Sequence, residues 1–263
     1  MIINTVTSLS PTLVPAHPFT APAWTPAASV AQDGNPRLAA HLRAWLGGGP
    51  PADGFRLVVW PGHDEPGWDG RTAFGQGIES PDGALLSLSP AVVADARAID
   101  RERVAAALRA PDAAVAVPAA LGRPDLRLGR AVFRWSAQPA RLPEVGEWVA
   151  PTDPRLPPWL RPFNGGILVA WDERGRYAAG VGVKRHNRHA DELAVATDPA
   201  HRGRGLARLL VAQAARRTVL QGALPVYLHE TDNPASARVA EAAGFPDRGW
   251  RVLNLFPAPR FDA

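Results

Sequence analysis

The chain has 263 residues, of which 46% are hydrophobic, and a formal net charge of +4, which suits one large globular domain or two small ones. It contains no cysteine, and this excludes disulfide bonds, thiolate metal ligands and a cysteine nucleophile. Because the sequence has neither a run of about 18 apolar residues nor a basic segment followed by an apolar one at its start, we expect a cytoplasmic protein with no membrane partner.

The N-terminal half carries scattered structural signals. Residues 1–36 are rich in proline and alanine, a composition typical of an extended segment. Helix-capping residues, helix-breaking glycines and prolines, and the alternation of apolar and polar residues predict the elements that follow. In chain order these are a helix at Pro36–Leu46, a strand at 55–60, one helix or two in series between Ser89 and Pro111, and a strand at 129–137. We group residues 37–145 as an N-terminal α/β domain. In the fold as a whole it would be an α+β domain or extension added to the C-terminal half.

A proline-dense connector separates this half from the next, with a boundary between about residues 140 and 160. Beyond it the pattern is regular. It predicts a hairpin of two strands (165–171 and 176–183), then a strand (190–197), a helix (205–220), a strand (224–230), a helix (233–245) and a final strand (250–256). This order predicts a mixed sheet with helices on its faces. We assign residues 146–263 to a second domain.

The stretch HRGRGLARLL, residues 201–210, joins a strand to a helix through two glycines and several arginines. A helix N-terminus offers unpaired N–H groups to an anion, and arginines add charge-assisted hydrogen bonds. A nucleoside triphosphate loop would need a lysine here, but Lys184 is the only lysine. A dinucleotide fingerprint would need a third glycine at Arg208. The basic residues are not clustered with aromatic ones, so nucleic acid is not expected. A solvated, arginine-rich helix start is the alternative.

Two motifs carry a resemblance to a known family. Arg202-Gly203-Arg204-Gly205-Leu206-Ala207 resembles the acetyl-CoA-binding motif of the GNAT N-acetyltransferase superfamily, Arg/Gln-x-x-Gly-x-Gly/Ala. Asn233, followed by Gly244 and Phe245, is similar to the family's second motif. The resemblance covers about residues 163–257 and implies a mixed, mostly antiparallel, twisted sheet with helices on both faces. The N-terminal half carries no motif of that family, and it is expected to shape the acceptor site.

The resemblance also implies a set of residues that bind acetyl-CoA, the acetyl donor. The amides of residues 203–207 and the arginines beside them would hold the pyrophosphate, and the strand edge at 195–197 would pair with the pantetheine arm. A backbone N–H there would polarise the thioester carbonyl. The full cofactor-binding set is Val195, Ala196, Thr197, Arg202, Gly203, Arg204, Gly205, Leu206, Ala207, Asn233 and Ser236. Asn233 would also cap its helix, and the cap alone is the alternative.

Catalytic candidates come from the proton transfers that amide formation requires. Glu192 occupies the place of the family's general base; the alternative is an ion pair with Arg188. Glu230, at the end of the next strand, is a rival base. Many family members have a tyrosine as general acid seven residues after the helix-capping asparagine, whereas this chain has Ala240, so Tyr227 is the substitute candidate.

The acceptor is expected to be a small-molecule amine or a peptide, and a homodimer is left open. His186 and His189, with Asp191 close by, have a spacing found in zinc sites, but we expect no metal, because the KRHNRH stretch (184–189) is expected to be an exposed loop without a fourth ligand. The leading hypothesis is therefore an acetyl-CoA-dependent N-acetyltransferase acting on a primary amine. The alternative is a non-catalytic acyl-CoA-binding module.

Overall fold

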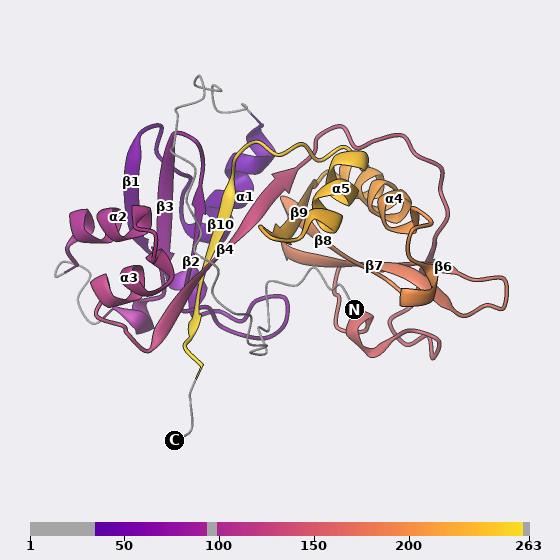
Figure 1. Cartoon of the computed structure of the whole chain (residues 1–263), viewed down its shortest axis with the longest axis horizontal. Helices are drawn as coiled ribbons and strands as arrows, with labels where there is room; N and C mark the ends of the chain where they lie inside the picture. The colour runs from indigo at the N-terminus through magenta and orange to yellow at the C-terminus, as the bar shows by residue number, and fades with distance from the viewer. Residues whose placement is uncertain (1–34, 94–98, 260–263) are drawn as a thin grey trace.

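The fold is built on one ten-stranded sheet, seen in a computed structural model that describes residues 35–93 and 99–259 (Figure 1). The strand order is β1-β3-β2-β10-β4-β9-β8-β7-β6-β5. The strands are β1 Gly54–Val59, β2 Gly75–Glu79, β3 Gly83–Leu88, β4 Leu126–Trp135, β5 Glu147–Val149, β6 Ile167–Trp171, β7 Tyr177–Asn187, β8 Ala190–Thr197, β9 Leu224–Glu230 and β10 Arg251–Pro257. Most neighbouring pairs are antiparallel, and in the described ranges only β1 with β3 and β8 with β9 are parallel.

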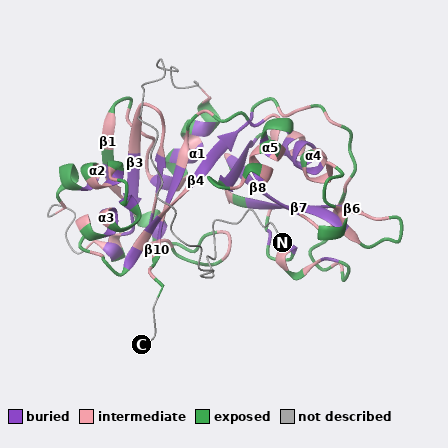
Figure 2. Ribbon diagram, viewed as in Figure 1, coloured by how far each residue is buried: buried purple, intermediate pink, exposed green. Residues whose placement is uncertain are grey.

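Five α-helices of the described residues lie on the two faces of the sheet: α1 Pro36–Leu46, α2 Arg101–Arg109, α3 Ala113–Ala120, α4 Leu206–Leu220 and α5 Pro234–Ala242. Leu253 and Leu255 of β10 pack in one apolar cluster with residues of α2 and α3, whereas the intervening Val252 packs with α1. Because successive strand side chains point to opposite faces, α1 lies on the face opposite α2 and α3. Figure 2 shows the central strands buried between these layers. The predicted mixed α/β fold with helices on both faces is confirmed.

The C-terminal strand joins the two halves of the chain. β10 pairs antiparallel with β2 on one side and with β4 on the other, and β4 in turn pairs with β9. In Figure 1 β10 runs alongside β4, although the two are more than 100 residues apart. Strands from both halves therefore share one hydrogen-bonded sheet, and the division at residues 145/146 stays a prediction.

β8 and β9 part after a short parallel contact. They pair only from Ala190 to Glu192 of β8, while β7 pairs with β8 as far as Thr197. The edge of residues 193–197 that faces β9 thus has no partner strand within the described part of the chain. The divergence leaves a gap in the ladder between two otherwise paired strands, and helices α4 and α5 lie on one face above it.

Local signals predicted some elements well and others poorly. α1 begins and ends as expected, with Asn35 as N-cap and Gly47 in the left-handed conformation after its last residue. The predicted start of the next helix, at Ser89, was wrong. Ser89 caps only a 3-10 turn at Pro90–Val92, and α2 begins at Arg101. Residues 94–98 and 1–34, where the extended segment was expected, lie outside the described residues.

The sequence analysis missed four elements: β2, β3, β5 and α3. β2 is short and glycine-containing, and β5 lies inside the proline-dense connector. Each is paired with a neighbouring strand, β2 with β3 and β5 with β6. Helix α3 begins just after the proline expected to end the preceding helix, and it contains Pro118. Tertiary packing overrides weak local propensity in each case.

Candidate functional site

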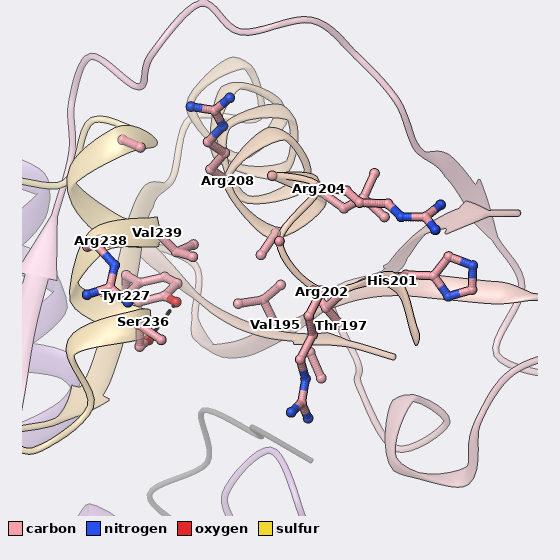
Figure 3. A pocket seen from close by; sticks show the side chains of 17 residues that line it. Val195, Thr197, His201, Arg202, Arg204, Arg208, Tyr227, Ser236, Arg238 and Val239 are labelled. Carbon is pink, nitrogen blue, oxygen red and sulfur yellow. Dashed lines mark hydrogen bonds between the residues drawn. The ribbon is translucent and has the colours of Figure 1, made fainter. Parts of the chain in front are cut away.

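A cavity of about 670 Å³ opens where β8 and β9 diverge (Figure 3). Three segments line it: the end of β8, the loop that leads into α4 with the first turn of that helix, and β9 with one face of α5. Its lining residues are Val195, Ala196, Thr197, His201, Arg202, Gly203, Arg204, Gly205, Leu206, Ala207, Arg208, Tyr227, Ala235, Ser236, Arg238, Val239 and Ala242. Ten of the eleven residues predicted to bind the cofactor lie on this wall, and Asn233 does not.

The loop before α4 presents backbone donors to the cavity. Gly203 and Gly205 have φ values of +78° and +76°, a left-handed conformation that favours glycine. In the described part of the chain, the N–H groups of residues 203–208 donate to no backbone carbonyl. Such consecutive free donors at a helix N-terminus form a site for an anion.

The surroundings of Gly205 restrict which residues can replace it. A Cβ built on Gly205 would lie 2.9 Å from Nε of Arg208, whereas one on Gly203 would meet nothing within 4 Å. A Gly205→Glu substitution would strain both the backbone and the Arg208 side chain, so it is unsuitable for a binding test that must leave the fold intact. An arginine substitution on the cavity wall avoids that strain.

Five basic side chains surround the cavity: His201, Arg202, Arg204, Arg208 and Arg238. Figure 3 shows the side chains of Arg202 and Arg204 on the loop and of Arg208 on the first turn of α4 pointing in different directions. Together with the free N–H groups they give parts of the cavity wall a positive character, while Val195, Leu206 and Val239 make other parts apolar. The cavity therefore suits an elongated ligand with both anionic and apolar parts.

Tyr227 and Ser236 form a hydrogen-bonded pair on the wall of the cavity. Their hydroxyl oxygens are 2.8 Å apart, one on β9 and the other on α5 (Figure 3). The Tyr227 ring is fully buried beside Phe245. Ala240, at the position where the family often has a tyrosine, is also fully buried. Tyr227 thus brings a phenolic hydroxyl to the cavity from a different element.

Asn233 acts as a helix cap. Its side chain accepts a hydrogen bond from the backbone N–H of Ser236, with Oδ1 and N 3.0 Å apart. This orients the first turn of α5, which carries Ser236 on the cavity wall. The capping part of the prediction is confirmed, and a direct contact with the cofactor stays a prediction.

Glu192 lies on the sheet face opposite α4 and α5, because its neighbours Leu193 and Val195 pack against those helices. One carboxylate oxygen is 2.6 Å from Nζ of Lys184, and the other is 2.9 Å from Nε2 of His186. Burial raises the pKa of Glu192, but the Lys184 ammonium and the hydrogen bond from His186 outweigh burial and lower it to about 2.

Two expectations about this region were wrong. Arg188 is not the partner of Glu192, since Lys184 and His186 hold both of its oxygens. The KRHNRH stretch is not all exposed loop, because β7 extends to Asn187 and buries Lys184. The pairing of Lys184 with Glu192 follows from the register of β7 on β8, which no local pattern specifies.

Glu230 ends β9 and does not line the cavity. Partial burial of the carboxyl group and the nearby Asp232 raise its pKa above the ordinary value. Its neighbour His229 accepts a hydrogen bond from Nε of Arg134 and donates one to the carbonyl of Glu230. Glu230 is therefore the more basic of the two candidate carboxylates, neither of which lines the cavity, and its role as a base stays a prediction.

The histidine and aspartate residues near the β7–β8 turn do not converge on one point. His186 is bound to Glu192, whereas Asp191 pairs with Arg185. Over the described ranges no group of three or more histidine, aspartate or glutamate side chains is arranged to hold a metal ion. In the same residues no helix is both long and apolar enough to cross a membrane.

The sequence analysis missed several residues of the cavity wall: His201, Arg208, Ala235, Arg238, Val239 and Ala242. Helical spacing could have found most of them. Arg208 lies one turn after Arg204, and Arg238, Val239 and Ala242 lie on the same face of α5 as Ala235. The missing information was which face of α5 points toward β8.

These features define a domain with a mixed sheet, two diverging parallel strands and, between them, a cavity lined by free backbone donors and arginines. Residues 130–245 match the family model for the acetyltransferase (GNAT) family. The chain therefore contains a GNAT acetyltransferase domain, and its C-terminal position agrees with the resemblance of the two motifs.

Solved structures of this family are similar to part of the chain. One from Novosphingobium aromaticivorans, assigned to the GNAT family, is 23% identical, with a TM-score of 0.43 over 52% of this chain and 69% of that one. A GNAT-family acetyltransferase from Colwellia psychrerythraea is 15% identical, with a TM-score of 0.39 over 51% and 57%. A tandem GNAT protein from the clavulanic acid biosynthesis pathway is 17% identical, with a TM-score of 0.37 over 59% and 61%. The chain spans less than two thirds of the length of the last two proteins. No curated protein matches the chain.

Proposed function

We propose that this protein is an acetyl-CoA-dependent N-acetyltransferase that acetylates a primary amine of a small molecule or peptide. The observation that carries the proposal is the cavity itself: free backbone donors, arginines and an unpaired strand edge meet there, within a GNAT domain. The location in the cytoplasm and the absence of nucleic-acid or membrane partners stay predictions.

The residues present fit coenzyme A. The N–H groups of residues 203–207, with Arg202 and Arg204, would hold the pyrophosphate, because a helix N-terminus and guanidinium groups both favour phosphate oxygens. The unpaired edge of Val195–Thr197 would accept the amide-containing arm as an added strand. Acetyl-CoA would supply an activated acetyl group as a thioester.

Amide formation requires a balanced set of bond changes. The acceptor ammonium loses a proton, its nitrogen bonds to the acetyl carbon, and the carbon–sulfur bond breaks, with the electron pair leaving on sulfur. A backbone N–H at the end of β8 would stabilise the negative charge that develops on the carbonyl oxygen, a contribution of about 3 kcal/mol for one well-placed donor. The products are an acetylated amine and free coenzyme A thiol.

Tyr227 is the candidate proton donor for the departing sulfur. Its hydroxyl lies on the cavity wall beside Ser236, and Ala240 carries no titratable group. A thiol has an ordinary pKa of about 8.5, so the leaving group needs only modest help. With Tyr227 in this role, an acetyltransferase would not need the tyrosine that many family members have on α5.

One observation favours a second function, a non-catalytic acyl-CoA-binding module. Both oxygens of Glu192 are already bound, and its low pKa makes it a weak base. If no other group accepted the proton of the acceptor, the same cavity would bind acyl-CoA without turning it over.

Thermal melting with coenzyme A tests the cavity. Ligand at about 100 times its dissociation constant should stabilise the fold by about 2.7 kcal/mol. Arg204→Ala should reduce this shift, whereas Arg103→Ala, an exposed position on α2, should not. The absence of any shift in the wild-type protein would remove both acyl-CoA functions.

Release of free thiol from acetyl-CoA, measured with a panel of amines, separates the enzyme from the module. Acceptor-dependent release that exceeds hydrolysis supports the acetyltransferase. Binding of coenzyme A without release for any amine would favour the module instead.

A further inference from the structure

Lys184, His186 and Glu192 form a hydrogen-bonded cluster on the sheet face opposite α4 and α5. Glu192 is the last residue of β8 that pairs with β9 before the two strands diverge. Three residues further along the same strand, Val195 begins the cavity wall. The cluster thus lies where a ligand held along Val195–Thr197 would approach the point at which the strands part.

Glu192 is positioned to orient another group and is not itself poised to take a proton. Each of its oxygens has a basic partner. Lys184, the only lysine of the chain, has a side chain that is 3% exposed, with its Nζ 5.2 Å from the centre of the Trp68 ring. A buried ammonium at 2.6 Å keeps the carboxylate ionised. An ionised carboxylate of this kind is a strong hydrogen-bond acceptor for a neighbouring imidazole.

His186 is the member of the cluster that could accept a proton on a ring nitrogen. Nε2 lies 2.9 Å from Oε2 of Glu192, so in the neutral ring Nε2 carries the hydrogen and Nδ1 carries the lone pair. Among the described residues Nδ1 of His186 has no hydrogen-bond partner, and 21% of the side chain is exposed. The Trp45 ring lies 6.1 Å away and limits the directions in which the imidazole can turn.

We propose that His186 is the general base of the acetyl transfer, with Glu192 and Lys184 as positioning residues. This inference rests on the proposed function and identifies how the acceptor loses its proton. The acceptor ammonium gives one proton to Nδ1 of His186, its nitrogen keeps the electron pair for attack on the acetyl carbon, and the imidazolium later releases the proton to solvent. The Glu192 carboxylate stabilises the imidazolium.

The charged and titratable groups around His186 come from three elements. Glu192 faces it from β8 and Lys184 from β7. From α1, His41 stacks on Trp45 and is hydrogen-bonded to Asn187. Burial, with a further contribution from His186, lowers the pKa of His41 to about 4, so His41 is neutral at the pH where the enzyme would work. His189 follows at the turn. The only negative charge in this set is the Glu192 carboxylate, which is hydrogen-bonded to His186.

Substitution of His186 tests the proposal. His186→Ala should lower kcat by about 100-fold or more, the usual contribution of a general base, while the melting shift with coenzyme A is kept. Added imidazole should raise the kcat of the His186→Ala variant at least tenfold above its value without imidazole. The matched control, His189→Ala, removes a histidine from the adjacent turn and should leave kcat within about threefold. A His186→Ala variant within threefold of wild type would overturn the proposal, and so would a loss that imidazole does not restore.

The positioning role of Glu192 has its own readouts. In Glu192→Gln the acidic limb of the kcat/KM profile should move to lower pH, because the imidazolium loses its carboxylate partner; an unmoved limb would contradict the role. A second measurement does not depend on turnover. Nitrogen chemical shifts of the histidine rings, with His186→Gln used for assignment, should show His186 with hydrogen on Nε2 at neutral pH. Hydrogen on Nδ1 would refute the proposal even if the protein acetylates amines, and failure to acetylate any amine would refute only the function.

Discussion

Tyr227 is the proposed substitute for a tyrosine that is absent from α5. The phenol reaches the cavity from β9, while the usual position on α5 is the buried Ala240. The chain has only one other tyrosine, Tyr177, whose hydroxyl donates to the carbonyl of Ala196. The two tyrosines therefore provide a matched pair for testing the proton donor.

Tyr227→Phe should lower kcat by about tenfold, at the low end of general acid catalysis because a thiolate leaves readily. It should also cost about 1 kcal/mol of stability, since Ser236 loses a buried partner. Tyr177→Phe, which removes a hydroxyl from the other face of the sheet, should leave kcat within about threefold. Steady-state kinetics with saturating acetyl-CoA would decide, and equal rates for the two variants would exclude Tyr227 as the acid.

The strand β4 is held to its neighbours by a buried arginine. Arg134, with a side chain 6% exposed, donates to His229 on β9 and to the carbonyl of Phe245. It also pairs with Glu241 of α5, with Nη1 and Oε2 3.0 Å apart. One guanidinium thus joins a strand of the N-terminal half to β9 and α5, two elements of the cavity.

Arg134→Met should destabilise the protein by about 2–4 kcal/mol, because it leaves a buried carbonyl and imidazole without their donor. Arg123→Met, which breaks an ion pair between Arg123 and Asp125 on the surface, should cost far less. Urea unfolding of both variants measures the difference. Equal midpoints would show that Arg134 does not hold β4 in place.

The stability of the whole molecule should depend on pH through two buried histidines. Burial lowers the pKa of His41 and of His63 from 6.5 to about 4. Between these values the unfolded chain binds protons that the folded chain does not, so this stability is complete above about pH 6.5 and is lost as the pH falls toward 4. Each histidine contributes about 3 kcal/mol over the full window. Glu192 adds a further loss below about pH 4.5, where its unfolded form is protonated.

Urea unfolding at pH 7, 5.5 and 4.5 checks this dependence. His63→Gln keeps a polar group near Ser87, the hydrogen-bond partner of His63, and should make the decline clearly shallower. His189→Gln, at the β7–β8 turn, should leave the decline unchanged. A wild-type stability that does not fall between pH 7 and 4.5 would contradict the prediction.

The division into two domains can be tested on the same molecule. Residues 146–263 alone would keep β9 and β10 but lose β4, which separates them. β9 and β10 are each antiparallel to β4, so they are parallel to each other and cannot simply pair as a hairpin. We expect this fragment to lack a cooperative melting transition by circular dichroism, in contrast to the full chain. A cooperative transition in the fragment would establish the predicted boundary.

Much of the cavity could be predicted from local sequence, because its parts depend on short-range rules. Positive φ at Gly203 and Gly205, the cap at Asn233 and the alternation along β8 each involve only a few neighbouring residues. The Glu192 cluster could not be predicted in the same way. Its contacts depend on the register of β7 against β8, and a shift of one residue would turn Lys184 and His186 to the other face.

The sequence by itself therefore determined most elements of the C-terminal half, the glycine conformations of the loop before α4 and the family resemblance. Only the tertiary structure decided that β10 lies between β2 and β4, that Tyr227 meets Ser236, and that the single lysine is buried against Glu192. The physical reason is the range of the interactions. Caps and glycine conformations are set within one turn of chain, whereas strand order and side-chain pairing across a sheet are set by hydrogen bonds and apolar burial between residues far apart in sequence.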